Sequence, residues 1–249
     1  IPIEQVEVGD VVFTHKGNWK PVTHTWIFHE QNPVRVKATR LAEGIVCSGI
    51  EPFWARYGNP LNMVRNEPEW CLAKDIGSRH DRRRRWNLLS PAAFPEEDQP
   101  EFPFRYNDDL ETLYWIFGVY QAEGSTSEKA GQVTLSIHES EVDQVREAVE
   151  ALGHNAGVSL PKGQNGKGRD IYFSSQPFIK FLREHFGRGK SKRIPSWMYG
   201  APEKLRMRFL EGALYGDGYE VHPGAYEYVT VIRSLAYEMK MLGQTLGYT

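Results

Sequence analysis

Hydrophobic and polar positions alternate in short runs over the first hundred residues. Runs rich in Val, Trp, Phe and Thr are separated by turn residues, and this pattern predicts β-strands. We expect strands at 11–14, 22–27, 34–37 and 45–47. Residues 90–103 then hold four prolines and four acidic residues, which is typical of a linker. The pattern predicts an all-β domain at 1–104 and a second domain at 105–249.

After residue 105 the apolar positions recur every three or four residues, which predicts amphipathic helices. Asp108 and Asp109 are expected to cap a helix that ends at Gly124. Further helices are expected at 142–152, 177–186, 202–213 and 234–246, with a strand at 133–137 and an extended region at 226–231. Helices intermixed with short strands predict an α+β second domain.

Composition and charge narrow the class of protein. The chain has 249 residues, 40% of them hydrophobic, and no uninterrupted apolar run of the roughly 18 residues that a membrane span needs. No signal peptide is recognisable, so we expect an intracellular protein without a membrane partner. The two cysteines, Cys47 and Cys71, lack the spacing of a zinc site or a disulfide framework.

The net charge of −2 excludes a uniformly basic nucleic-acid binder but hides two opposed regions. Residues 91–150 contain 14 acids and three bases, a net of −11, whereas residues 160–208 contain 12 bases and three acids, a net of +9. The second region is of the kind that a phosphate backbone attracts.

Two segments repeat one pattern: a helix, a glycine, an apolar pair, a small residue, an acid and a glycine. They lie at 117–125 and 211–219. Their glycines are Gly118, Gly124, Gly212 and Gly218. The first glycine of each pair lets two helices approach closely, and the second turns the chain beside the acid. Glu123 and Asp217 should therefore meet at the helix ends, where two carboxylates can hold divalent metal ions.

Both segments resemble the LAGLIDADG motif of homing endonucleases, and the block from Lys192 to Pro195 resembles the lysine-x-isoleucine-proline block of intein endonucleases. The resemblance implies a domain of αββαββα repeats that cuts double-stranded DNA. It also implies that Glu123 and Asp217 bind two or more Mg²⁺ ions, with Mn²⁺ as a substitute, and that Lys192 is the active-site lysine. Because one chain carries both motifs, it implies a monomer with pseudo-two-fold symmetry and an asymmetric DNA target.

The second repeat is shorter than this family pattern. Only 32 residues (249−217) follow Asp217, which is enough for one extended region and one helix. A second active-site lysine is missing from them. We therefore expect an incomplete second half.

The N-terminal residues resemble the Hint fold of inteins at 3–12 and 69–77. Splicing requires a Cys or Ser at residue one, a Thr-x-x-His block and a terminal His-Asn pair. The chain has Ile1 at the first position, Ser48 and Glu51 at the ends of the block, and no His-Asn pair before Thr249. We expect that this chain does not splice and that Ser48 and Glu51 are remnants of the block.

Several basic residues are candidates for DNA contacts, because arginine and lysine pair with phosphates and enter the grooves of DNA. The candidates are Arg82, Arg83, Arg84, Arg85 and Trp86 in one tract, Lys162, Lys167 and Arg169 in a glycine-rich loop, and Lys190 and Arg193 beside Lys192. The arginine tract could equally be a solvated loop.

The sequence therefore predicts a site-specific DNA endonuclease that is part of an intein or derived from one. Three alternatives stay open: a DNA-binding regulator or remnant that no longer cuts, a splicing element whose termini are missing, and an RNA maturase. ATP binding is rejected, because the Gly-Lys-Ser at 189–191 lacks the P-loop glycine at the position of Glu184.

Overall fold

The computed structural model describes residues 3–37, 44–58, 67–76, 98–160 and 166–248, and the backbone of 85–88. Contacts divide the chain into two units, residues 1–93 and 94–249. Residues 98–104, which were predicted to precede the second domain, therefore belong to the second unit. The reason is that the Phe102 and Phe104 rings pack against its core, with Phe104 4.2 Å from Phe178 between ring centroids.

The described part of the first unit is built from short antiparallel strands and turns. Its strands are β1 (Val11–Phe13), β2 (Trp19–Pro21), β3 (Val34–Val36), β4 (Ile45–Cys47), β5 (Pro52–Gly58), β6 (Glu69–Leu72) and β7 (Arg85–Leu88). They form three small sheets, in the orders β1-β2, β3-β4 and β6-β5-β7. Cys71 is buried and Cys47 is partly buried.

The strand predicted at 22–27 is not formed. Phe13 pairs with Trp19 across a turn, so the returning strand is β2 and ends at Pro21. Beyond it Trp26 and Ile27 are 71% and 90% exposed, without a described strand beside them. A tight turn fixes the register of its hairpin, and apolar alternation further along cannot move it.

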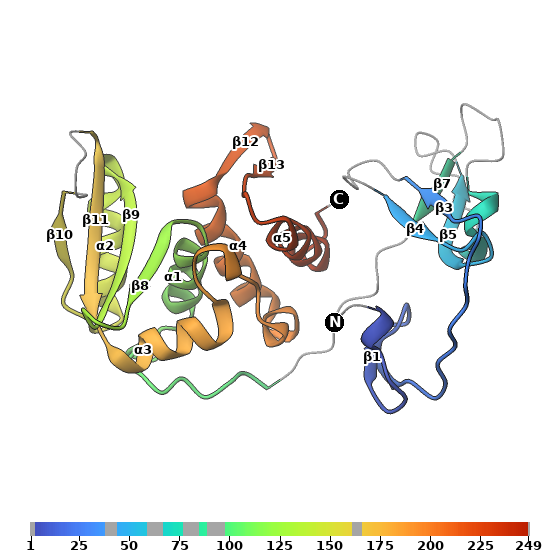
Figure 1. The fold of residues 1–249 in the computed structure, drawn as a ribbon. Coiled ribbons are helices and arrows are strands. Elements are labelled where there is room, and N and C mark those ends of the chain that lie inside the picture. Colours follow the sequence, from blue (N-terminus) through green and yellow to red (C-terminus); the bar gives the residue numbers. More distant parts are fainter. Residues whose placement is uncertain are drawn as a thin grey trace. The chain divides into compact units, whose positions relative to one another are not determined.

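The second unit contains the helices and one larger sheet (Figure 1). The helices are α1 (Leu110–Glu123), α2 (Val142–Ala151), α3 (Gln176–Phe181), α4 (Glu203–Asp217) and α5 (Arg233–Thr245). The strands are β8 (Gly124–Ser127), β9 (Gln132–His138), β10 (Gly157–Ser159), β11 (Gly168–Ser174), β12 (Gly218–His222) and β13 (Ala225–Tyr228). The predicted helices and the strand at 133–137 are confirmed, and the chain is a mixed α/β protein with small sheets.

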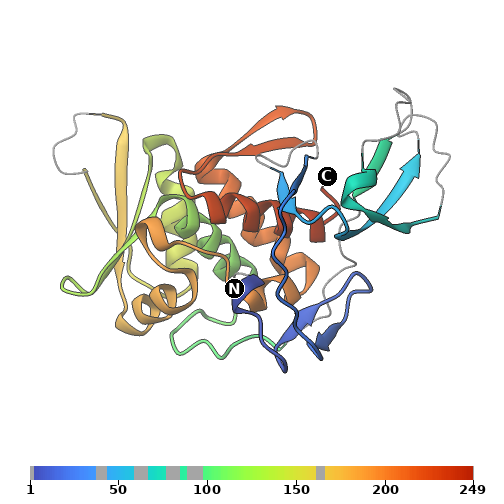
Figure 2. The ribbon, with the colours of Figure 1, turned by 45° about the vertical axis from the view of Figure 1, so that its right-hand side comes forward.

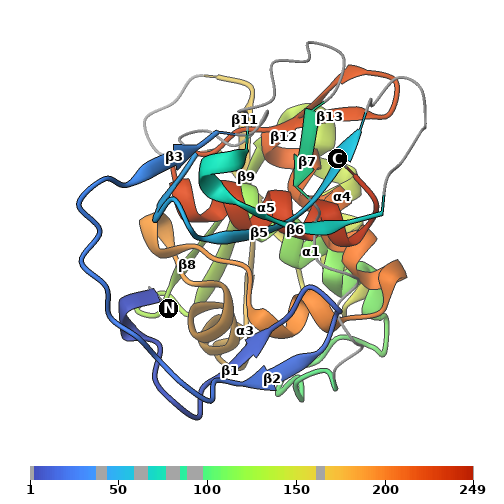
Figure 3. The ribbon, with the colours of Figure 1, turned by 90° about the vertical axis from the view of Figure 1, so that its right-hand side faces the viewer.

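The two acid-bearing helices α1 and α4 lie side by side at the centre of the second unit (Figure 2). The antiparallel sheet β10-β11-β9-β8 lies on the α1 side, and the hairpin β12–β13 follows α4. Leu135 and Ile171 pair at the middle of the sheet and are fully buried. Figure 3 shows α5 beside α4. Among residues 218–248 the hairpin β12–β13 and helix α5 follow Asp217. The predicted helix is confirmed, whereas the extended region predicted at 226–231 is strand β13, which ends at Tyr228 and pairs with the unpredicted strand β12.

Glycine makes the contact between α1 and α4 possible. A Cβ atom built on Gly118 would lie 2.1 Å from the carbonyl oxygen of Phe209, and one built on Gly212 would lie 2.1 Å from the carbonyl oxygen of Trp115. Both distances are far inside van der Waals contact, so only glycine allows the two backbones to touch. The close packing predicted for Gly118 and Gly212 is therefore confirmed.

The glycines that end the helices act differently from the prediction. Gly124 has φ −87° and Gly218 has φ −114°, so neither adopts a left-handed turn. Each helix instead passes directly into a strand. Glycine is required because a Cβ atom on Gly124 would lie 2.2 Å from the Tyr120 ring, and one on Gly218 would lie 2.6 Å from the Cα atom of Leu214.

We predict that Gly118→Ala lowers the free energy of unfolding of the second unit by about 1–3 kcal/mol or more, because the added methyl group overlaps a backbone carbonyl. Urea unfolding followed by circular dichroism measures this. Gly243→Ala on α5 is the control, since its Cβ atom would meet Tyr248 at an ordinary 3.7 Å. Equal stability of the two variants would contradict the backbone contact.

Candidate active site

Glu123 and Asp217 are the last residues of α1 and α4, and both are partly buried. The contact between the helices brings these ends together. A Cβ atom on Gly216, next to Asp217, would lie 2.8 Å from Cγ of Glu123 and 3.7 Å from its Oε1. The Glu123 side chain therefore lies over the last turn of α4, so the predicted pairing of the two acids is present in the fold.

The two carboxyl groups hold protons more tightly than usual. Burial raises the pKa of Glu123 most strongly, and the charge of Asp217 raises it further. Burial also raises the pKa of Asp217, against an opposing effect of Lys192. Desolvation and like charge both disfavour the ionised form. A divalent cation would relieve both effects.

Lys192 lies beneath this pair, and its side chain is 8% exposed. Its Nζ donates hydrogen bonds to the last carbonyl oxygens of α1, those of Tyr120 at 2.9 Å, Gln121 at 3.1 Å and Ala122 at 3.2 Å. These carbonyls carry the negative end of the helix dipole, so a cation is favoured there. Burial lowers the pKa of Lys192 to about 8, although both carboxylates oppose that change. The ammonium group thus caps the helix that carries Glu123.

The loop that carries Lys192 is fixed on both sides. α3 continues as a π-helical turn, Leu182–Phe186, and ends at Gly187 with φ +73°, a conformation that favours glycine. Tyr120 Oη donates to the Gly187 carbonyl oxygen at 2.7 Å. On the other side the Ile194 amide donates to Oε2 of Glu238 on α5 at 2.7 Å. Helix α1 and helix α5 therefore hold the lysine loop together.

Three polar neighbours of the site had no sequence signal. Glu141 contributes a further negative charge to Glu123. The side-chain amide of Gln121 and the hydroxyl oxygen of Tyr228 are both buried. Neither has a hydrogen-bond partner among the described residues. The repeated motif marks the acids but not Glu141 and Tyr228, because these two come from outside its segments. Gln121 lies within the first segment, at a position that the repeated pattern leaves unspecified.

Glu123 and Asp217 are the acidic side chains at this site that could hold a divalent metal ion. In the described part of the chain no group of three or more His, Cys, Asp or Glu residues is placed to hold a metal ion. Mg²⁺ often binds through one or two carboxylates, with water and substrate phosphates as its other ligands. Glu123 and Asp217 could supply those carboxylates.

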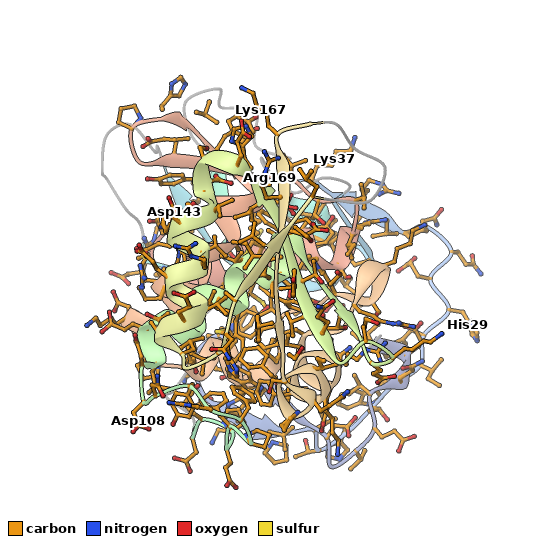
Figure 4. All side chains as sticks on the ribbon, turned by 90° about the vertical axis from the view of Figure 1, so that its left-hand side faces the viewer. His29, Lys37, Asp108, Asp143, Lys167 and Arg169 are labelled. Atoms are coloured by element: carbon orange, nitrogen blue, oxygen red, sulfur yellow. The ribbon has the colours of Figure 1, made fainter. Side chains whose placement is uncertain are left out.

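The predicted DNA contacts are spread over the chain. Lys190 and Arg193 are exposed, and the Arg193 guanidinium donates to the Glu184 carbonyl. Figure 4 shows Lys167 and Arg169 at one end of β11, where Lys167 is exposed and Arg169 pairs with Glu139 at 2.8 Å. Arg82, Arg83, Arg84 and Lys162 lie outside the described residues. Arg85 and Trp86 belong to β7, and their DNA role remains a prediction.

Ser48 and Glu51 lie in the turn between β4 and β5. Ser48 Oγ donates to Oε2 of Glu30 at 2.7 Å, and the Glu51 amide donates to the Ser48 carbonyl at 3.1 Å. These contacts stabilise a turn and leave the remnant hypothesis as a prediction.

No described helix is both long and apolar enough to cross a membrane.

No protein-family model matches the chain. The ATP-dependent DNA helicase Hel308 of Thermococcus kodakarensis is 25% identical in an alignment that covers 99% of this chain and 26% of the helicase. The replication factor C small subunit of Methanocaldococcus jannaschii is 30% identical over 43% of this chain and 7% of its own length. The tRNA-splicing ligase RtcB of Methanopyrus kandleri is 26% identical over 49% of this chain and 14% of its own length. The chain thus spans from 7% to 26% of the length of these relatives.

Two solved structures show partial similarity. The full-length DUF199/WhiA from Thermatoga maritima has a TM-score of 0.33 and 14% identity over 49% of this chain and 38% of its own. The N-terminal LAGLIDADG domain of DUF199/WhiA has a TM-score of 0.32 and 15% identity over 51% of this chain and 58% of its own.

We predict that Lys192→Met lowers the free energy of unfolding by about 2–4 kcal/mol, because the carbonyls of Tyr120, Gln121 and Ala122 lose their hydrogen bonds to the ammonium group. Lys190→Met, in the same loop but exposed, is the matched control and should change stability little. Chemical denaturation of both variants measures the difference. Similar losses for both would show that the helix cap is not what Lys192 contributes.

We predict that Asp217→Asn raises Tm at pH 7. The pKa of Asp217 is higher in the folded chain than its ordinary value of 3.8, so its contribution to stability is present below that value and is lost as pH rises through the folded pKa. Because solvent screens this partly exposed group, we expect a gain of no more than about 1 kcal/mol, or about 2–4 °C.

Thermal unfolding of both proteins between pH 3 and pH 8 tests this sign. The gain from Asp217→Asn should shrink as the wild-type carboxyl becomes protonated. A variant that is less stable than the wild type at pH 7 would show that the charge of Asp217 stabilises the fold.

Proposed function

We propose that this chain is a metal-dependent DNA endonuclease of the homing type, belonging to or derived from an intein. Its substrate is an asymmetric double-stranded DNA site, and its reaction is hydrolysis of phosphodiester bonds. The observation that carries this proposal is the meeting of Glu123 and Asp217 at the ends of two helices whose backbones touch. The proposal includes a Hint-like origin for the first unit.

The electrostatics of the site support a metal. Two half-buried carboxylates with raised pKa values oppose the stability of the fold when both are ionised. Such a cost is typical of functional sites. Glu123 and Asp217 would hold Mg²⁺, which when bound lowers the pKa of a water ligand and stabilises negative charge on the phosphate.

The chain's own residues would orient that reaction. The helix contact fixes the spacing of Glu123 and Asp217, and Lys192 holds the last turn of α1 in place. The Lys192 charge would also stabilise negative charge that develops near the carboxylates. The exposed residues Lys167 and Lys190 would bind the phosphate backbone.

The alignments with relatives support the proposal that this chain is a module carried by several different host proteins. A DNA helicase, a replication factor subunit and an RNA ligase bear unrelated names, yet each aligns with this chain over a minor part of its own length. This pattern is expected for an inserted element such as an intein. It supports the intein part of the proposal independently of the carboxylate site.

A second candidate is a DNA-binding protein that no longer cuts. The Lys192 ammonium group donates three hydrogen bonds to backbone carbonyls, and Arg169 is already paired with Glu139. A site with these groups engaged could bind DNA without hydrolysing it.

Cleavage of selected DNA distinguishes the two. Duplexes bound in Ca²⁺ are selected from a randomised library, cloned into a supercoiled plasmid and incubated with the full chain in Mg²⁺ or Mn²⁺. We expect nicking or linearisation, and at least about a 100-fold loss of rate in Asp217→Asn, the equivalent of about 3 kcal/mol of transition-state stabilisation. Asp143→Asn, at an exposed carboxylate on α2, is the control.

The outcomes separate the candidates. Salt-sensitive binding without any nicking would favour the non-cutting DNA binder. Undiminished cutting by Asp217→Asn would exclude that carboxylate from the reaction, and failure to select any duplex would overturn both candidates.

A further inference from the structure

Tyr228 is the last residue of β13 and lies beside the end of α4. It pairs with Gly218 across the hairpin, and the next amide, that of Val229, donates to the Asp217 carbonyl oxygen at 2.9 Å. The rest of the hairpin is exposed except for Gly218, whereas Tyr228 is partly buried and packs against the core. The backbone therefore turns this one aromatic side chain toward the helix pair.

The Tyr228 hydroxyl is a buried donor for which the described part of the chain provides no acceptor. Its oxygen is shielded from solvent and has no hydrogen-bond partner among the described residues. Buried hydroxyl groups in folded proteins are nearly always hydrogen-bonded, to protein or to ordered water. The Tyr228 hydroxyl therefore requires a hydrogen-bond acceptor.

The charges of the two carboxylates of the site act on Tyr228. Burial raises the pKa of the Tyr228 phenol, and the charges of Asp217 and Glu123 raise it further. A carboxylate or a water molecule could accept the hydrogen bond that the phenol hydroxyl can donate. A water molecule is held well where two to four polar groups converge, and a bridge from this hydroxyl to the two carboxylates would meet that condition.

We propose that Tyr228 is a positioning residue of the carboxylate site, whose hydroxyl donates a hydrogen bond to a water molecule bridging it to Glu123 and Asp217. The bridge would orient both carboxylates for a divalent cation. This inference rests on the proposed function for the identity of the cation, but the hydrogen bond itself does not depend on DNA cleavage.

Removal of the hydroxyl tests the first part. Tyr228→Phe keeps the ring and its packing, and the affinity of the full chain for Mg²⁺ is measured by titration calorimetry. We expect an affinity loss of about 10-fold or more, the range found when groups that orient metal ligands are removed. Tyr219→Phe is the matched control, because Tyr219 lies on the paired strand, is 52% exposed and already bonds to Glu227.

The hydrogen bond is tested separately by nuclear magnetic resonance of the chain labelled with ¹³C at tyrosine Cζ. The Tyr228 signal is identified by its loss in Tyr228→Phe. In Asp217→Asn we expect this signal to shift, while that of Tyr199, which donates to the Glu238 carbonyl, stays in place.

The two measurements test different parts of the inference. A wild-type chain that binds neither Mg²⁺ nor Mn²⁺ overturns the metal-dependent function, and a shift of the Tyr228 signal in Asp217→Asn would still support the link to the carboxylates. An unchanged Tyr228 signal overturns the inference whatever the metal affinity. Equal Mg²⁺ affinity of Tyr228→Phe and the wild type overturns the positioning role.

Discussion

The backbone contact between α1 and α4 is the constraint on which the second unit depends. Gly118 and Gly212 face the opposite helix at a distance that leaves no room for a Cβ atom. Two helices held this closely must bring their ends together as well, and each helix ends at an acid. Because the chain passes directly from each helix into a strand, the same contact also sets where β8 and β12 begin. The position of the candidate site is thus a consequence of helix packing.

This arrangement lowers the stability of the fold at the candidate site, because the groups that could react are buried there together. Two carboxylates and an ammonium group are withdrawn from water together, and desolvation outweighs the attraction between them for Lys192, whose pKa falls to about 8. Lys192 contributes to the fold through hydrogen bonds to the end of α1, with the loop anchored by Gly187 and Glu238. The lysine therefore links the geometry of the acids to α3 and α5. Packing of the whole unit determines how the carboxylates are held.

The sequence predicted what depends on local spacing. A glycine and an acid at fixed positions on two apolar helices were enough to pair Glu123 with Asp217. The partners of Lys192 could not be predicted, because they are backbone carbonyls 70 to 72 residues away. Phe102 lies in the stretch with the composition of a linker and Phe104 directly follows that stretch, yet both rings pack in the core of the second unit. Tyr228 could be placed in an extended region, but its direction depends on the register with Gly218.

The C-terminal ends of α1 and α4 have chemically different surroundings, and this difference bears on the proposed reaction. Glu123 leads into a four-stranded sheet and is influenced by Glu141, whereas Asp217 leads into a two-stranded hairpin and lies beside Tyr228. The two segments repeat one motif, but the surroundings of its acids are not equivalent. If the pair binds metal ions, each acid would present a different set of neighbouring donors to the DNA strand it faces. The asymmetric duplex that we propose as the substrate would match this inequality, since a symmetric duplex would place identical phosphates against unlike surroundings.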